Sequence, residues 1–267
     1  MSAPRLGVVG WPVAHSRSPA MQNAALRAAG LEDWRFQLLP MPPDGMVEAV
    51  RALPGAGFRG ASVTIPHKEA VLGALDEISG PAREIGAVNT LVIDDSGRIR
   101  GENTDAPGFI AALPAEVGPQ TAATVLGAGG SARAVAWALR SAGAQVRIWN
   151  RTPERARELA GELGVEAVDR PASTGILVNC TAAGMDGDPF ETLPVGPDAL
   201  EPPAGGCVAA RVVHNQRQQP ALHLACSLDG ESERHRVVQS QVISEPVDHT
   251  RRGRVHRGVD GHGRRAV

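Results

Sequence analysis

Apolar positions in the first hundred residues mark a series of short strands and helices. A buried run at residues 5–10 predicts a strand, and residues 19–29 predict a helix with Ser18 as its N-cap and Gly30 just past its end. The other elements expected here are strands at 34–39, 61–65, 88–93 and 98–101, a helix at 44–53, and a helix starting near His67. Strands that alternate with helices in this way favour an α/β sheet with helices on its faces.

A second series of elements starts near Thr121. A strand at 123–126 runs into a glycine-rich turn, and an Ala-rich helix follows at 131–142. Next come a strand at 145–149, a helix at 153–163 and a strand at 175–179. Pro107, Pro114 and Pro119 place the boundary between the two series within residues 108–120. We therefore predict an α/β domain over residues 1–107 and a Rossmann-like domain over 108–207.

The last sixty residues have a different character. Residues 187–206 are rich in Pro and Gly, and from residue 208 onward we find no sustained helical or strand period. The segment 208–267 holds 10 Arg against 6 acidic residues, and it holds six of the eight His. We interpret 208–267 as an atypical basic, aperiodic tail. Nucleic-acid binding by this tail is an alternative, although its Arg residues are not interleaved with aromatic ones.

Composition narrows the remaining possibilities. The net charge of −2 argues against general nucleic-acid binding by the whole chain. The three cysteines form no CxxC pair and no metal site is expected, so reduced thiols in a cytoplasmic protein are the plain interpretation. No apolar run approaches the ~20 residues that span a bilayer, and no secretory signal is visible.

The glycine-rich turn has the spacing of a dinucleotide-binding loop. Gly127, Gly129 and Ala132 match G-x-G-x-x-G/A, and the turn follows a strand and opens a helix. Gly127 allows the tight turn, Gly129 lets the backbone approach a pyrophosphate, and Ala132 permits close packing of helix and strand. The helix N-terminus offers N–H groups and a partial positive charge to the phosphates.

Residues after the next strand indicate which dinucleotide binds. An NAD site usually places an acid there to bond the ribose 2′-hydroxyl, but this chain has Asn150, Arg151 and Thr152, with Arg155 one turn on. Arg forms bidentate bonds to phosphate, so NADP is the better match. A solvated helix start with Thr152 as N-cap and Pro153 at N1 is a compatible alternative.

Polar side chains gather after strands of the first domain. Ser16 and Ser18 stand at the mouth of a helix, a place that suits a carboxylate. Lys68 is the only lysine beside 26 Arg, and Lys can exchange a proton where Arg practically cannot. Asp105 near Lys68 would hold its ammonium in position. Together with Asn89, these groups suit a polyhydroxylated acid as substrate.

Taken together, the motifs resemble the shikimate dehydrogenase family. The matching segments are GWPVAHSRSPAMQN, SVTIPHK, IGAVNTL, GENTDAPG, LGAGGSARA, NRTPER and NCTAAGM, in the family's order over about residues 5–185. The resemblance implies reversible, NADPH-dependent reduction of 3-dehydroshikimate to shikimate in aromatic amino-acid (chorismate) biosynthesis. It makes 1–107 the substrate-binding domain and 108–207 the NADP-binding domain. The expected small-molecule partner is the substrate, shikimate or 3-dehydroshikimate. A homodimer is a possible assembly.

The resemblance also implies a role for individual residues. Lys68 and Asp105 would be the catalytic pair, with Lys68 as general acid. The substrate carboxylate would lie on Ser16 and Ser18, and the ring hydroxyls on Thr64, Asn89 and Asp105. The residues that would bind NADP are Gly127, Ala128, Gly129, Gly130, Ser131 and Ala132 at the pyrophosphate, Asn150, Arg151, Thr152 and Arg155 at the 2′-phosphate, and Thr181, Ala182, Gly184 and Met185 near the nicotinamide.

The chain departs from the family in two places within motifs and throughout its tail. Gln22 stands where the family usually has His, and Ser62 where Asn is common. From residue 208 the family's final strand, its Gly–Met–Leu–x–x–Gln helix and its returning helix have no assignable counterpart. We hypothesise a frame shift near 208–211, an unrelated replacement, or a disordered tail. Two functional alternatives follow: a dehydrogenase of quinate or a related cyclic hydroxy acid, and an NADP-binding protein with impaired catalysis.

Overall fold

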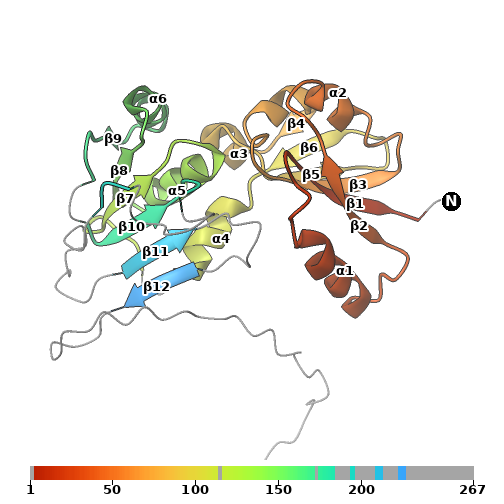
Figure 1. The fold of residues 1–267 in the computed structure, drawn as a ribbon, viewed down its shortest axis with the longest axis horizontal. Coiled ribbons are helices and arrows are strands. Elements are labelled where there is room, and N and C mark those ends of the chain that lie inside the picture. Colours follow the sequence, from red (N-terminus) through yellow and green to blue (C-terminus); the bar gives the residue numbers. More distant parts are fainter. Residues whose placement is uncertain are drawn as a thin grey trace, which may run out of the picture.

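The chain folds into two α/β lobes, each built on its own six-stranded sheet (Figure 1). A computed structural model describes residues 3–113, 116–171, 174–183, 193–195, 208–212 and 222–226, the last two segments as backbone only. In Figure 1 the first sheet and its helices lie to the right of the second, with α4 (Asp105–Ala112) and α5 (Gly130–Ser141) between the sheets.

The first lobe has a mixed sheet in the order β2-β1-β3-β5-β6-β4. The first three strands in this order are parallel, and β5 is antiparallel to both β3 and β6. The strands are β1 (Arg5–Gly10), β2 (Arg35–Pro40), β3 (Phe58–Val63), β4 (Glu77–Ile78), β5 (Thr90–Ile93) and β6 (Ile99–Glu102), and the helices are α1 (Ser18–Ala28), α2 (Met46–Arg51), the 3₁₀ helix η1 (Ala70–Ala74) and α3 (Gly80–Ile85).

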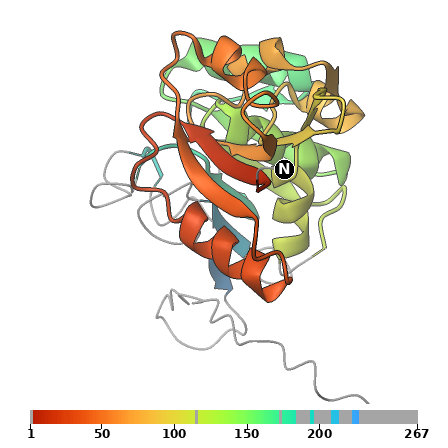
Figure 2. The same ribbon diagram turned by 90° about the vertical axis from the view of Figure 1, so that its right-hand side faces the viewer.

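Side chains alternate between the two faces of this sheet, as the period of a strand requires. Val8 packs with Phe36 and Leu26 on the α1 side, whereas neighbouring Val9 packs with Val50 and Val71 on the side of α2 and η1. Helices therefore cover both faces, as Figures 1 and 2 show.

The second lobe has a sheet in the order β12-β11-β10-β7-β8-β9, parallel except for β12. Its elements are β7 (Ala122–Leu126), β8 (Gln145–Trp149), α6 (Pro153–Leu163), β9 (Glu166–Ala167), β10 (Ile176–Asn179), β11 (Val208–Val212) and β12 (Leu222–Cys226). The core includes Ala106 and Phe109 of α4, which packs on α5. The predicted boundary between residues 107 and 108 thus falls inside α4, and this helix connects the lobes.

Two local predictions in the first lobe are wrong. Ser18 is not the N-cap: α1 begins at Ser18 itself, and the cap position is Arg17 with no capping side chain. The helix expected from His67 is only the short η1, because a backbone group that a longer helix would need is bonded to another part of the chain. The Lys68 carbonyl accepts from the Val88 N–H at 2.7 Å, and that bond replaces one that a continuing helix would make.

The structure also extends the second sheet where no strand was expected. β11 pairs in parallel with β10, with Val208 opposite Ile176, and β12 pairs antiparallel with β11. Ladder pairing with an existing strand supplies the order that the local sequence pattern did not predict. The rest of the predicted tail, 213–221 and 227–267, lies outside the described residues.

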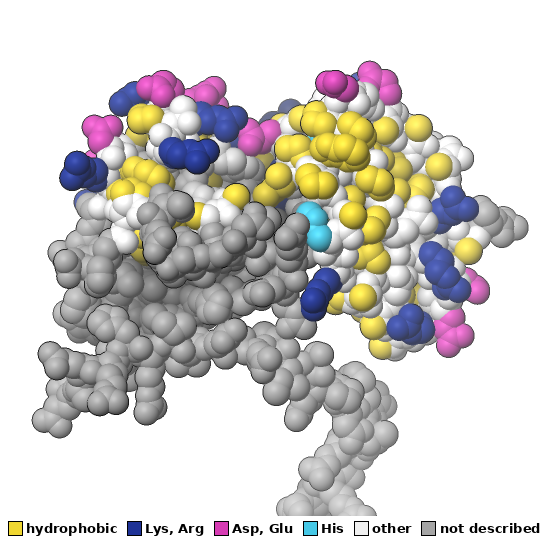
Figure 3. Space-filling model, viewed as in Figure 1, with side chains coloured by type: hydrophobic (Ala, Val, Ile, Leu, Met, Phe, Trp, Pro, Cys, Tyr) yellow, Lys and Arg dark blue, Asp and Glu magenta, His cyan; other side chains and the backbone are white. Residues whose placement is uncertain are grey.

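Among the described residues, no helix is long and apolar enough to cross a membrane. On the face drawn in Figure 3, hydrophobic side chains gather over the first lobe, and side chains of both charges lie over the second. Two exposed hydrophobic residues stand at the ends of neighbouring strands: Trp11 follows β1 and Ile65 follows β3, each 45% exposed. The Trp11 N–H donates to the Ile65 carbonyl at 3.1 Å, so these two loops lie side by side.

Candidate active site

An ion pair between Lys68 and Asp105 forms the centre of the site. Lys68 follows the end of β3, Asp105 opens α4, and Nζ lies 2.6 Å from Oδ2. The lysine side chain is only 4% exposed, while the carboxylate is 22% exposed. A buried ammonium requires such a partner, since leaving it unpaired would cost several kcal/mol. The geometry brings together the two residues that the sequence predicts as the catalytic pair.

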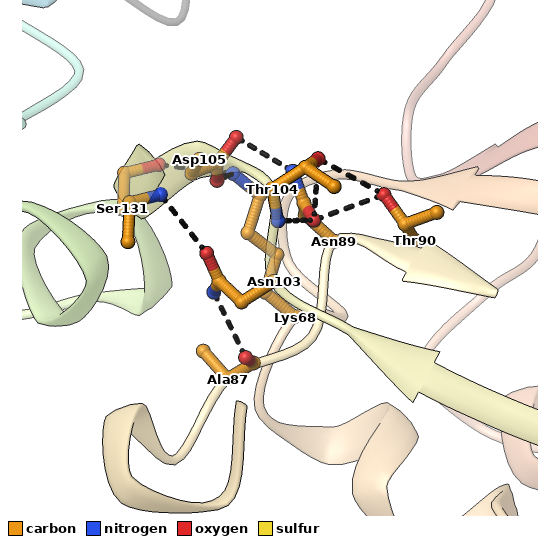
Figure 4. A network of polar contacts seen from close by, with 9 residues as sticks. Lys68, Ala87, Asn89, Thr90, Asn103, Thr104, Asp105 and Ser131 are labelled. Atoms are coloured by element: carbon orange, nitrogen blue, oxygen red, sulfur yellow. Dashed lines mark hydrogen bonds and ion pairs between the residues drawn. The ribbon is translucent and has the colours of Figure 1, made fainter. Parts of the chain in front are cut away.

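The other oxygen of Asp105 belongs to a network with Asn89 (Figure 4). Asn89 Nδ2 donates to Asp105 Oδ1 at 2.7 Å and to Thr104 Oγ1 at 2.9 Å. The side-chain Oδ1 of Asn89 accepts from the Thr104 N–H at 2.8 Å, and Thr90 Oγ1 completes the network at 3.1 Å from Thr104 Oγ1. Each carboxylate oxygen of Asp105 thus accepts a hydrogen bond, Oδ2 from Lys68 and Oδ1 from Asn89. The bond from Asn89 fixes the orientation of the carboxylate and so the position of the Lys68 ammonium.

Asn103, which lies in the GENTDAPG segment, supports this network. Its buried side chain donates to the Ala87 carbonyl at 2.9 Å and accepts from the Ala106 N–H at 3.2 Å. The second bond satisfies a free N–H group in the first turn of α4. Asn103 therefore ties α4, and with it Asp105, to the segment before Asn89.

The predicted substrate residues lie around the ends of β1 and β3. Thr64 is buried just after β3, and its N–H donates to the Val9 carbonyl at 2.9 Å. Ser16 and Ser18 lie at the start of α1, where Ser16 Oγ donates to Ser18 Oγ at 3.1 Å. The Ser18 N–H donates to Ser16 Oγ at 3.3 Å. The two hydroxyls are therefore neighbours, as a shared carboxylate would require.

The glycine-rich turn has the geometry of a phosphate-binding loop. Gly127 has φ +116°, and a Cβ there would lie 3.1 Å from the Cys180 carbonyl, so only glycine fits. A Cβ on Gly129 would meet no atom within 4 Å, which leaves its surface open to a ligand. Ala132 is completely buried. No side chain caps the N-terminus of α5, so the first N–H groups can bind phosphate.

The expected 2′-phosphate residues follow β8. Asn150 Nδ2 donates to the Thr152 carbonyl at 3.0 Å and closes the turn into α6. Thr152 occupies the predicted N-cap position with Pro153 after it, although its side chain makes no capping bond. Arg151 and Arg155 are both exposed. Two exposed guanidinium groups beside the loop fit a phosphorylated ribose, and no acidic side chain stands in the position that would favour NAD.

The loop after β10 borders the catalytic pair. Asn179, buried and not singled out in the sequence, accepts from the Thr181 N–H at 2.9 Å and from its hydroxyl at 2.7 Å. This Asx turn shapes the segment that holds Thr181 and the exposed Ala182. The predicted nicotinamide residues Gly184 and Met185 lie outside the described residues.

Cys180 lies in the same loop, in the field of the catalytic pair. Burial raises the pKa of its thiol to about 12, with the charge of Lys68 opposing and the charge of Asp105 assisting that rise. Among the described residues, no group of three His, Cys, Asp or Glu side chains could hold a metal ion.

The family models and the curated relatives point to one family. The model for the shikimate dehydrogenase substrate-binding domain matches residues 8–91, and the model for shikimate/quinate 5-dehydrogenase matches residues 115–174. The chain is 46% identical over 225 residues to the NADP⁺ shikimate dehydrogenase of Methylobacterium radiotolerans, covering 78% of each chain. It is 48% identical over 197 residues to that of Thermus thermophilus, covering 71% of this chain and 72% of the relative.

A solved structure shows the same similarity in three dimensions. The shikimate 5-dehydrogenase of Thermus thermophilus in complex with NADP(H) and shikimate superposes with a TM-score of 0.68 at 42% identity. The superposition covers 79% of each chain.

Proposed function

Since this chain belongs to the shikimate dehydrogenase family, we propose a role in that family's reaction for each residue of its site. The protein is an NADP-dependent oxidoreductase that interconverts 3-dehydroshikimate and shikimate in aromatic amino-acid biosynthesis. The single observation that carries the mechanism is the 2.6 Å pair of Lys68 and Asp105.

Lys68 acts as the proton donor and acceptor. In the direction of reduction, its Nζ gives a proton to the carbonyl oxygen that becomes the new hydroxyl, a general-acid role. In the reverse direction the neutral amine takes that proton back. NADPH, when bound, supplies the hydride. Asp105 fixes the direction of Nζ, and Asn89 in turn holds Asp105.

The substrate carboxylate binds at Ser16 and Ser18, whose hydroxyls lie 3.1 Å apart at the start of α1. Thr64 and Asn89 bind ring hydroxyls, with Asp105 as a further acceptor. The support for this arrangement is chemical: hydroxyl, amide and carboxylate groups on neighbouring loops match a ring that carries several hydroxyls and one carboxylate.

The nucleotide binds to the second lobe. The pyrophosphate lies against the loop from Gly127 to Ala132 and the N-terminus of α5, which no side chain caps. Asn150, Arg151, Thr152 and Arg155 hold the 2′-phosphate, and Thr181 and Ala182 border the nicotinamide. In the proposed division, residues 1–107 bind the substrate and 108–207 bind NADP.

Two further proposals concern the setting of the enzyme. We propose that it works in the cytoplasm, where its cysteines stay reduced, and that it forms a homodimer. Fractionation of the source cells tests the first, and light scattering of the purified protein tests the second.

The direct test of function is shikimate oxidation by the purified chain with NADP, followed through the absorbance of NADPH. We expect turnover with shikimate, slower turnover with quinate, and a preference for NADP over NAD. Lys68→Ala is the control and should remove turnover while NADP still binds. Calorimetric NADP binding by the unchanged chain without any turnover would instead favour the alternative of an NADP-binding protein with impaired catalysis.

A further inference from the structure

Lys68 has a second polar partner that comes from the other lobe. Its Nζ donates to Ser131 Oγ at 3.1 Å, in addition to the 2.6 Å contact with Asp105. Asp105 belongs to α4, whereas Ser131 belongs to the first turn of α5, inside the loop proposed to bind the pyrophosphate. The Ser131 hydroxyl therefore connects the proton donor directly to the nucleotide loop (Figure 4).

The contact rests on close packing between the lobes. A Cβ on Gly130 would lie 2.7 Å from the Cβ of Lys68 and 3.2 Å from its Cδ, so the start of α5 packs directly on the lysine stem. Any larger residue at 130 would force the two apart. The backbone next to Ser131 is thus in van der Waals contact with Lys68, and the 3.1 Å bond is not a chance approach of two flexible side chains.

Two more contacts along α5 hold that approach in place. Arg133 Nε forms an ion pair with Glu69 at 3.3 Å, and Arg133 also pairs with Glu162 of α6. Trp137 Nε1 donates to Glu84 of α3 at 3.0 Å. With Gly130, these residues have the i, i+3, i+7 spacing of one helix face. This face, defined by Gly130, Arg133 and Trp137, attaches α5 to the substrate lobe.

We propose that Ser131 is a positioning residue for Lys68, which links the orientation of the proton donor to the placement of the nucleotide loop. The inference rests on the proposed function of Lys68 as general acid. Asp105 holds Nζ from the substrate lobe and Ser131 from the nucleotide lobe, so the ammonium is correctly directed only when both lobes are in register. Small errors of position are costly at such a step.

Within the described residues, charged and titratable groups from three segments surround Lys68. Asp105 of α4 pairs with it, Cys180 after β10 lies within its electrostatic influence, and the adjacent Glu69 is paired with Arg133. Ser131 is neutral at every working pH, so its replacement changes no charge in the site. Because Ser131 Oγ accepts a hydrogen bond from the ammonium, its removal takes away one of the contacts that direct Nζ.

The test compares Ser131→Ala with Ser141→Ala, a matched change at an exposed position in the last turn of the same helix. In Ser131→Ala, we expect kcat for reduction of 3-dehydroshikimate to fall by about tenfold, as one hydrogen bond to a charged group supports. KM for NADPH should stay close to that of the unchanged chain, because the loop binds phosphate through its backbone N–H groups. Ser131→Thr keeps the hydroxyl and should restore kcat. Ser141→Ala should change none of these.

The outcomes separate this inference from the proposed function. An unchanged kcat in Ser131→Ala would overturn it, as would a change confined to KM for NADPH, because the serine would then serve the nucleotide alone. Failure of Ser131→Thr to restore kcat would overturn it as well. If Lys68→Ala keeps full turnover, the proposed role of Lys68 fails instead. Thermal unfolding of each variant shows that the comparison is made between folded proteins.

Discussion

The Lys68 ammonium and the Asp105 carboxylate lie 2.6 Å apart, with the lysine side chain almost fully buried and the carboxylate partly open. This asymmetry has a chemical meaning. The cation is removed from bulk water, where it could exchange protons freely, while the open side of the pair leaves room for a ligand. Asn89 donates to the other carboxylate oxygen at 2.7 Å and keeps the acid from rotating away.

Replacing Lys68 should remove catalysis without removing binding. Lys68→Met keeps the length of the side chain but has no proton to give, and general acid–base groups contribute roughly 10²- to 10⁴-fold to rate. We expect kcat to fall within that range in both directions of the reaction, while Kd for NADP stays near that of the unchanged chain. Steady-state kinetics and calorimetry measure the two quantities. A loss of NADP affinity as large as the loss of kcat would show that Lys68 mainly supports the fold.

The two neighbouring glycines of the nucleotide loop should respond differently to alanine. At Gly130 a Cβ would meet the Lys68 stem at 2.7 Å, so Gly130→Ala should displace the proton donor and lower kcat. It should also lower the melting temperature of the protein, even in the absence of cofactor. At Gly129 a Cβ would meet nothing within 4 Å, and the backbone is extended, so Gly129→Ala should leave the melting temperature of the free protein unchanged. Its effect should appear only as weaker NADP binding.

Differential scanning fluorimetry with and without NADP distinguishes the two variants. The expected pattern is a lowered melting temperature for Gly130→Ala in both conditions and a reduced NADP-dependent rise for Gly129→Ala. If Gly129→Ala destabilised the free protein as much as Gly130→Ala, the loop would be packed against protein and not open to a ligand.

In the second lobe, the elements that follow the glycine-rich loop were predictable because their signals are local. The strand at 145–149 and the helix at 153–163 have the bounds that the sequence predicts, since Pro153 marks the helix start and Gly164, with φ +63°, its end. Ser18 and His67 show where such signals fail. The Ser18 hydroxyl bonds to Ser16 instead of capping α1, and His67 is buried with its Nε2 2.7 Å from the Met41 carbonyl.

For the site, sequence motifs predicted the chemical groups but not what holds them. Lys68, Asp105 and Asn89 were predicted and do lie together. The support from Asn103 and the docking of Arg133 on Glu69 were not predicted, because each joins segments whose proximity depends on tertiary packing. The sequence indicates that the two lobes share one site only through the order of the motifs in the resembling family.

The preference for NADP should depend on Arg151. Arg151→Ala removes an exposed guanidinium beside the proposed 2′-phosphate site, and a hydrogen-bonded contact to a charged group contributes about 1.5–3 kcal/mol. We expect NADP affinity to fall by roughly 10- to 150-fold, with NAD affinity almost unchanged. Arg157→Ala is the matched control, because Arg157 is exposed on α6 and pairs with Glu154 and Asp169. Equal losses for NADP and NAD would place Arg151 away from the 2′-phosphate.

The Cys180 thiol should resist alkylation while the protein is folded. The thiolate is the reacting form, and burial raises the pKa of this thiol from 9.0 to about 12, so well below pH 9 its thiolate population falls roughly a thousandfold. Labelling with iodoacetamide at about pH 8, followed by peptide mapping, should be at least about a hundredfold slower at Cys180 in the native protein than in urea, since local opening supplies part of the reaction. Lys68→Met removes the positive charge that lowers this pKa and should slow native labelling further. Equal native and urea rates would mean that the sulfur is open to solvent and that the loop after β10 does not close over it.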